Sequence, residues 1–169
     1  MKNSTRLIAA IVMLLSFAGF NANAQQSTLM TDVYASYFDV KDAMVKSDGK
    51  TTSAKAAALH KAIIAVPMDK MTSEEHTVWM KVLTALKEDA GHISGTTDAK
   101  RQREHFVNLS KNMHAVIKVL PAGEPVYYQK CPMANGGKGA NWLSKDKSIK
   151  NPYYGSAMLT CGSTVETLK

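Results

Sequence analysis

The sequence lacks the residues and motifs that mark most enzyme and scaffold classes. Only two cysteines occur among 169 residues, which excludes a disulfide-dense scaffold. There is no glycine-rich phosphate loop and no HExxH or GxSxG pattern, and the carboxylates form no obvious acid–base pair. We therefore expect no enzymatic activity. The content of 45% hydrophobic residues is sufficient for one core and argues against wholesale disorder.

Long hydrophobic runs are also absent, except at the N-terminus. Two basic residues precede an apolar stretch from Leu7 to Phe20, and residues 22–24 (Ala-Asn-Ala) form a small-x-small cleavage pattern. The apolar stretch is short for a spanning helix, and no cysteine follows the cleavage pattern as it would in a lipoprotein. We predict a signal peptide over residues 1–24 and a periplasmic protein without a membrane anchor over residues 25–169.

Basic residues are unevenly distributed along the chain. Residues 25–169 have a net charge of +5, whereas residues 98–150 alone have a net charge of +6. We expect no nucleic acid as a partner, because the lysines are scattered and are not interleaved with aromatic residues. Two interpretations remain open, a solvated basic face or a docking surface for an acidic partner.

Before Pro121, hydrophobic residues recur with the 3.6-residue period of a helix in four segments. Residues 47–49, Pro67 and Gly95 separate these segments, and Thr72 with Glu75 has the pattern of a capping box. Four amphipathic helices with short connections predict an up-down four-helix bundle over residues 25–121. The expected core positions are Leu29, Val33, Tyr37, Val40, Met44, Ala54, Ala58, Leu59, Ala62, Ile63, Val66, Trp79, Val82, Leu83, Leu86, Ala90, Ile93, Phe106, Leu109, Met113, Val116, Ile117 and Leu120.

Residues 122–169 have a different character, with several glycines, both cysteines and little regular pattern. We expect short strands at residues 126–129 and 158–160, with a loop between them. So irregular a segment must pack on the bundle or be held by a cross-link or a metal. The predicted fold is therefore mainly α, a single domain made of a four-helix bundle and an irregular, weakly β C-terminal segment.

A methionine lies two or three residues from each cysteine. Cys131 is followed by Met133, and Met158 precedes Cys161. Thiolate and thioether ligands favour Cu(I), and to some extent Ag(I) or Zn(II). A structural disulfide that closes the 30-residue separation is the alternative, worth roughly 3–4 kcal/mol, and the methionines would then be core filler. A catalytic cysteine with a histidine base is disfavoured, because a secreted cysteine with one possible partner is usually oxidised.

Two histidines have a methionine at helical spacing. His76 and Met80 are one turn apart, and His105 lies two turns before Met113. Imidazole and thioether on one helix face are a possible copper pair, whereas a hydrogen-bonded core histidine remains the alternative at each position. We expect His76, Met80 or His105 to complete a metal site if the C-terminal segment docks against the third and fourth helices.

The most distinctive stretches of the sequence lie near its C-terminal end, at residues 131–134, 139–144, 151–155 and 158–162. Together with residues 37–43, 76–80 and 102–110, they resemble an uncharacterised bacterial periplasmic helical-domain family. Members occur alone and also as the C-terminal domain of copper/silver-type efflux membrane-fusion adaptors. The Cys-Pro-Met tripeptide at residues 131–133 is also similar to that of small heavy-metal-binding modules, although Ala134 stands where those modules continue with a histidine.

The resemblance implies a soft-metal context. The expected function is binding of Cu(I) in the periplasm, either to sequester the ion or to hand it to an efflux adaptor or another envelope protein. Cys131 and Cys161 would be the thiolate ligands, and Met133 and Met158 the thioether ligands. The alternative is a non-catalytic structural or interaction domain that a Cys131–Cys161 disulfide staples.

Overall fold

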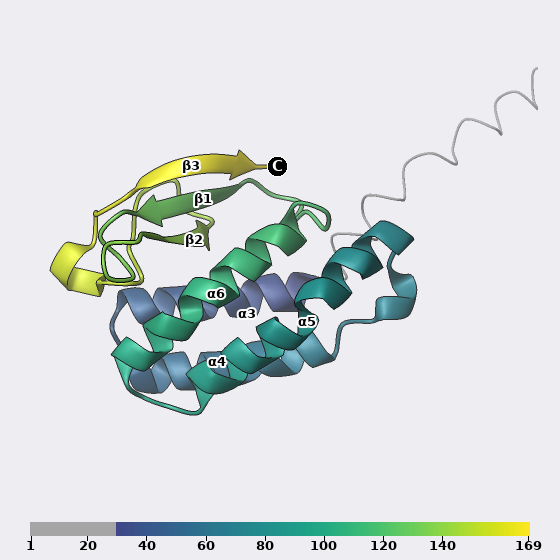
Figure 1. Cartoon of the computed structure of the whole chain (residues 1–169), viewed down its shortest axis with the longest axis horizontal. Coiled ribbons are helices and arrows are strands. Elements are labelled where there is room, and N and C mark those ends of the chain that lie inside the picture. The colour runs from purple at the N-terminus through teal and green to yellow at the C-terminus, as the bar shows by residue number, and fades with distance from the viewer. Residues whose placement is uncertain (1–29) are drawn as a thin grey trace, which may run out of the picture.

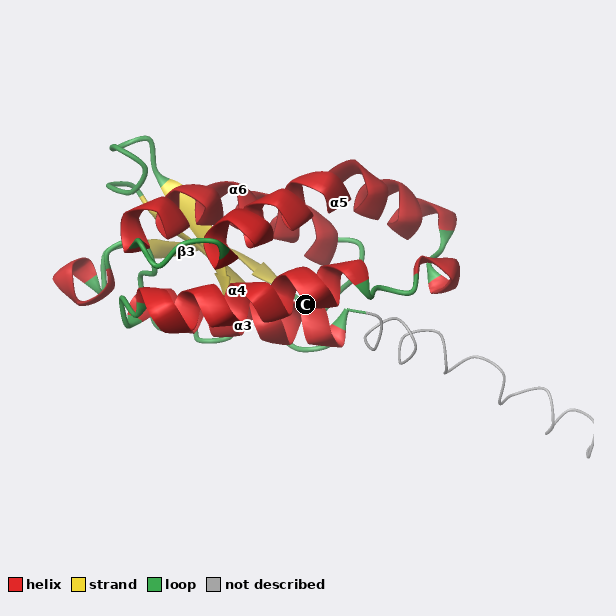
Figure 2. Ribbon diagram, turned by 90° about the horizontal axis from the view of Figure 1, so that it is seen from below, coloured by secondary structure: helices red, strands yellow, loops and turns green. Residues whose placement is uncertain are grey.

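The computed structural model describes residues 30–169, so the predicted signal peptide and Leu29 lie outside the described residues. Four helices occupy the first part of this range: α3 (Thr31–Val45), α4 (Gly49–Ile64), α5 (Ser73–Ser94) and α6 (Ala99–Ile117). Each helix packs on the next one in the chain, as Figures 1 and 2 show. Between residues 30 and 169, no helix has the length and hydrophobicity to cross a membrane.

Side-chain caps explain where three of these helices begin. The Asp48 carboxylate accepts a hydrogen bond from the Thr51 N–H, and the Asp98 carboxylate caps α6 in the same way. At the start of α5, Thr72 and Glu75 form both hydrogen bonds of the capping box, as predicted. Polar side chains thus satisfy backbone donors that a helix start would otherwise leave unpaired.

The buried faces of the helices agree with the predicted pattern except on α4. Trp79 and Phe106 are fully buried, which confirms their expected place in the core. Ala54 and Ala58, predicted as core residues, are exposed. The buried face of α4 is formed instead by Thr52, Ala56, Leu59 and Ile63. Because alanine occurs on both faces of this helix, its hydrophobic period does not identify the core side.

A three-stranded antiparallel sheet follows the helices. Its strands β1 (Val126–Cys131), β2 (Ala140–Ser144) and β3 (Ser163–Leu168) lie in the order β2-β1-β3. The predicted strand at residues 126–129 is confirmed as part of β1. The predicted strand at 158–160 is wrong, because the 3₁₀ helix η2 (Gly155–Met158) and a turn occupy this region. Strand β3 has a mostly exposed, polar sequence, so it shows no hydrophobic alternation that could predict it.

Buried polar contacts attach the sheet to the bundle. The Tyr37 hydroxyl on α3 lies 2.7 Å from the Ser110 hydroxyl on α6 and accepts a hydrogen bond from the Leu143 N–H of β2. On β1, the ring of Tyr128 stacks on that of His114 from α6, with 3.7 Å between ring centroids. The C-terminal segment therefore packs on α3 and α6, and the predicted fold class, a mainly α domain with a weakly β C-terminal segment, is confirmed (Figure 1).

Candidate functional site

The two cysteines lie together at one end of the sheet. Cys131 is the last residue of β1, and Cys161 comes two residues before the start of β3. Because β1 and β3 are antiparallel neighbours, the end of one strand meets the beginning of the other, with Lys130 opposite Ser163. The two Sγ atoms are 2.8 Å apart. The prediction that the cysteines are close enough to share a disulfide or a metal is therefore confirmed.

The cysteines differ in exposure, and Cys131 influences the ionisation of Cys161. The Cys131 side chain is fully buried, whereas Cys161 is partly exposed. Hydrogen bonding to the Cys131 thiol, together with burial, raises the pKa of Cys161 above its ordinary value, and a hydrogen bond from the Met133 backbone opposes this shift. Two thiolates side by side repel each other, so an electrophile or a metal ion is needed to stabilise the doubly ionised pair.

Both methionines predicted as ligands lie on the segments that carry the cysteines. Met133 is in the turn after Cys131, with 56% of its surface exposed, and the Tyr154 hydroxyl donates to its carbonyl at 2.8 Å. Met158 ends η2, and its carbonyl accepts a hydrogen bond from the Cys161 N–H at 3.1 Å. The fold thus brings the Cys-Pro-Met segment and the segment from Met158 to Cys161 to one end of the sheet.

The distance between the sulfur atoms determines what this pair can do. Two thiolates on one metal ion, with metal–sulfur bonds of about 2.3 Å, are about 3.8 Å apart in tetrahedral geometry and about 4.6 Å apart in a linear one. A disulfide requires about 2.05 Å. The observed 2.8 Å lies between these values, so metal binding requires the sulfurs to separate by about 1 Å or more, and oxidation requires a smaller approach.

The structure does not bring the predicted histidines to the cysteines. His76 and Met80 are exposed neighbours on α5. No three His, Cys, Asp or Glu side chains within the described range are arranged to hold a metal ion, so neither His76 nor His105 forms a three-ligand set with the cysteine pair there. His76 and Met80 therefore form a pair on the surface of α5, and His105 contacts another residue instead of the cysteines.

His105 connects α5 and α6. Its Nδ1 lies 3.3 Å from a carboxylate oxygen of Asp89, and its ring lies 4.5 Å from that of His92, measured between centroids. Burial raises the pKa of Asp89, while the hydrogen bond to His105 acts in the opposite direction. This contact matches the hydrogen-bonded histidine interpretation. Asp89 and His92 were not singled out from the sequence, where nothing sets them apart from the exposed polar residues around them.

Comparison with known families identifies one family that the sequence matches. Residues 33–123, just over half of the sequence, match the family described as "Protein of unknown function (DUF3347)". The chain is a member of the DUF3347 family. The matched range of this DUF3347 member covers most of α3 and all of α4 to α6, and it ends before β1, so both cysteines lie outside it. The expectation of an uncharacterised family is confirmed. No curated protein and no solved structure matches the sequence significantly.

Proposed function

We propose that this DUF3347 member binds Cu(I), or a similarly soft cation, through the thiolates of Cys131 and Cys161. The observation that supports the proposal most directly is the distance of 2.8 Å between the two sulfur atoms, which come from residues 30 positions apart. Soft sulfur donors prefer a monovalent d10 ion to borderline ions such as Zn(II) or Ni(II). The thiolates dominate the affinity, because each brings a negative charge to the cation.

The exposure of the site favours transfer over permanent storage. Cys131 is buried and fixed at the end of β1, whereas Cys161 and Met133 are accessible from solvent. An accessible thiolate and thioether let an incoming ligand join the metal before the first ligands leave. Ligand exchange of this kind requires no catalytic residue, in agreement with the absence of enzyme motifs from the sequence.

The setting of the proposed activity comes from the sequence. The predicted signal peptide directs the protein to the periplasm, and the resemblance to domains of copper/silver efflux adaptors suggests the receiving partner. We therefore propose that the protein sequesters the metal ion or hands it to an efflux adaptor or another envelope protein. The net charge of +6 over residues 98–150 would favour a partner with an acidic surface.

The distance of 2.8 Å between the Cys131 and Cys161 sulfurs also supports a second candidate function, a structural or interaction domain stapled by a disulfide. A Cys131–Cys161 disulfide would tie the exposed edge strand β3 to β1 and thereby to the bundle. A thiol count on the native protein, with and without copper, separates the two functions. Two free thiols that copper protects support metal binding, whereas no free thiol in the protein isolated from the periplasm supports the staple.

The test of the metal proposal is a competition titration with a chromogenic Cu(I) chelator under anaerobic, reducing conditions. The native protein should remove Cu(I) from the chelator, and Cys131→Ser or Cys161→Ser should nearly abolish this competition. Met133→Leu keeps the size and apolarity of the side chain but removes the sulfur, so it should weaken binding mildly. Met68→Leu is the matched control, because Met68 is a similarly exposed methionine in the 3₁₀ helix η1 (Met68–Lys70).

The outcome that contradicts the proposal is specific. If the Cys131→Ser/Cys161→Ser double variant competes as well as the native protein, the thiolates do not bind the metal, and the disulfide-stapled interaction domain is the better account. If Met133→Leu and Met68→Leu lower the Cu(I) affinity equally, Met133 is not a metal ligand, whereas the proposal for the two thiolates is unaffected.

A further inference from the structure

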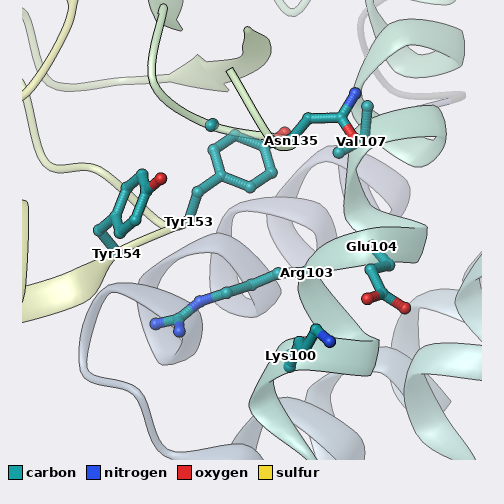
Figure 3. Close-up of a pocket in the computed structure, with 9 residues that line it drawn as sticks. Lys100, Arg103, Glu104, Val107, Asn135, Tyr153 and Tyr154 are labelled. Atoms are coloured by element: carbon teal, nitrogen blue, oxygen red, sulfur yellow. The ribbon is translucent and has the colours of Figure 1, made fainter. Parts of the chain in front are cut away.

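A cavity of about 400 Å³ lies between α6 and two turns of the C-terminal segment (Figure 3). One wall is a single face of α6, which carries Lys100, Arg103, Glu104 and Val107 at helical spacing. The opposite wall consists of the turn between β1 and β2 and the turn at residues 153–154. A volume of this size is within the range of small-molecule sites in proteins.

Arg103 is the unusual residue of the cavity. Its guanidinium is partly buried, and burial lowers its pKa. All of its hydrogen bonds go to neutral oxygens: Nε donates to the Pro152 carbonyl at 2.9 Å, and Nη2 donates to the Ser47 hydroxyl and, at 3.4 Å, to the Met44 carbonyl. In the part of the chain that the structure describes, no carboxylate pairs with Arg103, and Nη1 makes no hydrogen bond. A partly desolvated cation with unused donors favours an anionic ligand.

The other charged groups limit the charge of such a ligand. Lys100, one turn before Arg103, is exposed and forms no ion pair within residues 30–169. The Glu104 carboxylate lies on the same wall, so the lining carries two cations and one anion. A monoanion is attracted by this set, whereas a dianion such as a phosphate ester would also meet repulsion from Glu104.

The rest of the lining is apolar or aromatic. Tyr153 is buried and Tyr154 partly buried, and both lie on the side of the cavity opposite Val107, as Figure 3 shows. Gly136 has a φ of +64°, and a Cβ at that position would meet nothing within 4 Å, which leaves the cavity open there. An aryl or alkyl body can therefore bury its surface between the tyrosines and α6.

We propose that this cavity binds a small organic monocarboxylate with an apolar or aromatic body. The carboxylate lies toward Arg103, the exposed Lys100 on the same face of α6 adds attraction at longer range, and the body lies against Val107 and the two tyrosines. The site is separate from the cysteine pair and does not require a bound metal ion. It is a second ligand site on the same domain, formed where the C-terminal segment packs on α6.

Benzoate is the probe that tests this site, and benzamide is its neutral counterpart of the same shape. Titration of the ¹⁵N-labelled protein should give saturable amide shifts at Gly136 and its neighbours, with a dissociation constant for benzoate of ~1 mM. Benzamide should bind at least about tenfold more weakly, because it lacks the charge that Arg103 and Lys100 recognise. Phenyl phosphate should also bind more weakly than benzoate.

Two charge reversals on α6 supply a matched pair of variants. Lys100→Glu should weaken benzoate binding at least about tenfold. Lys111→Glu makes the same change to an exposed lysine about 16 Å further along the helix, beyond the screening length at physiological salt, and should leave binding within twofold. Both lysines are exposed, so neither change perturbs the core. Arg103 itself is not substituted, because its hydrogen bonds also support the fold.

Three results would overturn the proposal: equal shifts with benzoate and benzamide, shifts that do not saturate or are spread over the surface, or equal binding by the Lys100→Glu and native proteins. The titration is repeated with the Cys131→Ser/Cys161→Ser double variant, in which benzoate binding should persist. A negative copper titration therefore leaves this inference intact, and a negative benzoate titration leaves the copper proposal intact.

Discussion

The Tyr37 hydroxyl joins three elements of the fold, and its removal tests how the C-terminal segment is attached. The side chain is fully buried and lies between the Ser110 hydroxyl, at 2.7 Å, and the Leu143 N–H, at 3.1 Å. Leu143 is on β2, an edge strand of the sheet, so the tyrosine of α3 serves a backbone donor there. Tyr37→Phe removes only the hydroxyl, because phenylalanine keeps the stacked contact with Phe106, whose ring centroid is 5.4 Å away.

The magnitude follows from these partners. A buried N–H left without an acceptor costs roughly 1–3 kcal/mol, and the lost hydrogen bond to the Ser110 hydroxyl adds about 1 kcal/mol. We therefore expect Tyr37→Phe to lower the free energy of unfolding by about 2–4 kcal/mol. Burial raises the pKa of Tyr37 far above its ordinary value, so the hydroxyl stays neutral and the loss should be the same from pH 6 to pH 9.

Urea denaturation followed by circular dichroism measures this loss. Tyr127→Phe is the control, since Tyr127 is a partly buried tyrosine of β1 whose hydroxyl makes no hydrogen bond within the described residues, and it should change stability by less than ~0.5 kcal/mol. Ser110→Ala combined with Tyr37→Phe should cost less than the sum of the two single changes, because the two hydroxyls share one hydrogen bond. A loss below ~1 kcal/mol for Tyr37→Phe would refute the proposed attachment.

Three further predictions concern the core, the sheet and the cysteine pair. Trp79→Ala should lower stability by roughly 3–5 kcal/mol in urea denaturation, because Trp79 is fully buried, and a loss below ~1 kcal/mol would contradict that placement. The His114 ring nitrogen lies 2.7 Å from a carboxylate oxygen of Glu166, and this hydrogen bond lowers the pKa of the Glu166 carboxyl. The contact therefore stabilises the fold at neutral pH, and this stabilisation is lost as the pH falls through the Glu166 pKa. His114→Ala should raise the Glu166 pKa in an NMR titration. Because thiols bind Cu(I) as thiolates and the pKa of Cys161 is raised, Cu(I) binding should release thiol protons. The logarithm of the Cu(I) affinity should therefore rise with pH, by up to about two log units per pH unit where both thiols are protonated. A flat pH profile in the chelator competition would exclude thiolate ligands.

The helical half of the fold could be predicted because its sequence signals are local. Hydrophobic periodicity and the capping box at Thr72 and Glu75 identify α5 without any long-range information. The same reasoning failed for Ala54 and Ala58, since a small side chain satisfies a hydrophobic pattern whether it is buried or exposed. Periodicity therefore identifies the core best where the side chains are large, as at Trp79 and Phe106.

The sheet was harder to predict because its signals are long-range. Strand β2 is buried through contacts with α6 and α3, and β3 is a polar edge strand that begins directly after Gly162. Neither has the alternation of a half-buried strand that sequence analysis can detect. The cysteines were nevertheless expected to be close, since each flanks one of the two strands predicted for this segment. The partner strand proved to follow Cys161 instead of preceding it.

The residues that line the cavity could not be recognised from the sequence. Arg103 is one of ten basic residues scattered over residues 98–150, and its sequence neighbours do not distinguish it from a solvated lysine or arginine. Its burial depends on the turns at Ser47 and Pro152, which lie far from it in the chain. The sequence thus predicts the basic character of the region, while only the fold separates the one partly desolvated guanidinium from the exposed charges.

One turn connects the cysteine pair with the cavity, which gives the two proposed sites a physical means of coupling. The turn that follows Cys131 begins with a hydrogen bond from the Ala134 N–H to the Cys131 carbonyl, and its Met133 carbonyl accepts the Tyr154 hydroxyl. Ala134 and Tyr154 also line the cavity. A carboxylate ligand that contacts Tyr154 therefore acts on the segment that carries Met133, one of the proposed metal ligands. Because linkage is reciprocal, any factor by which the organic ligand changes the Cu(I) affinity is the factor by which Cu(I) changes the affinity for that ligand.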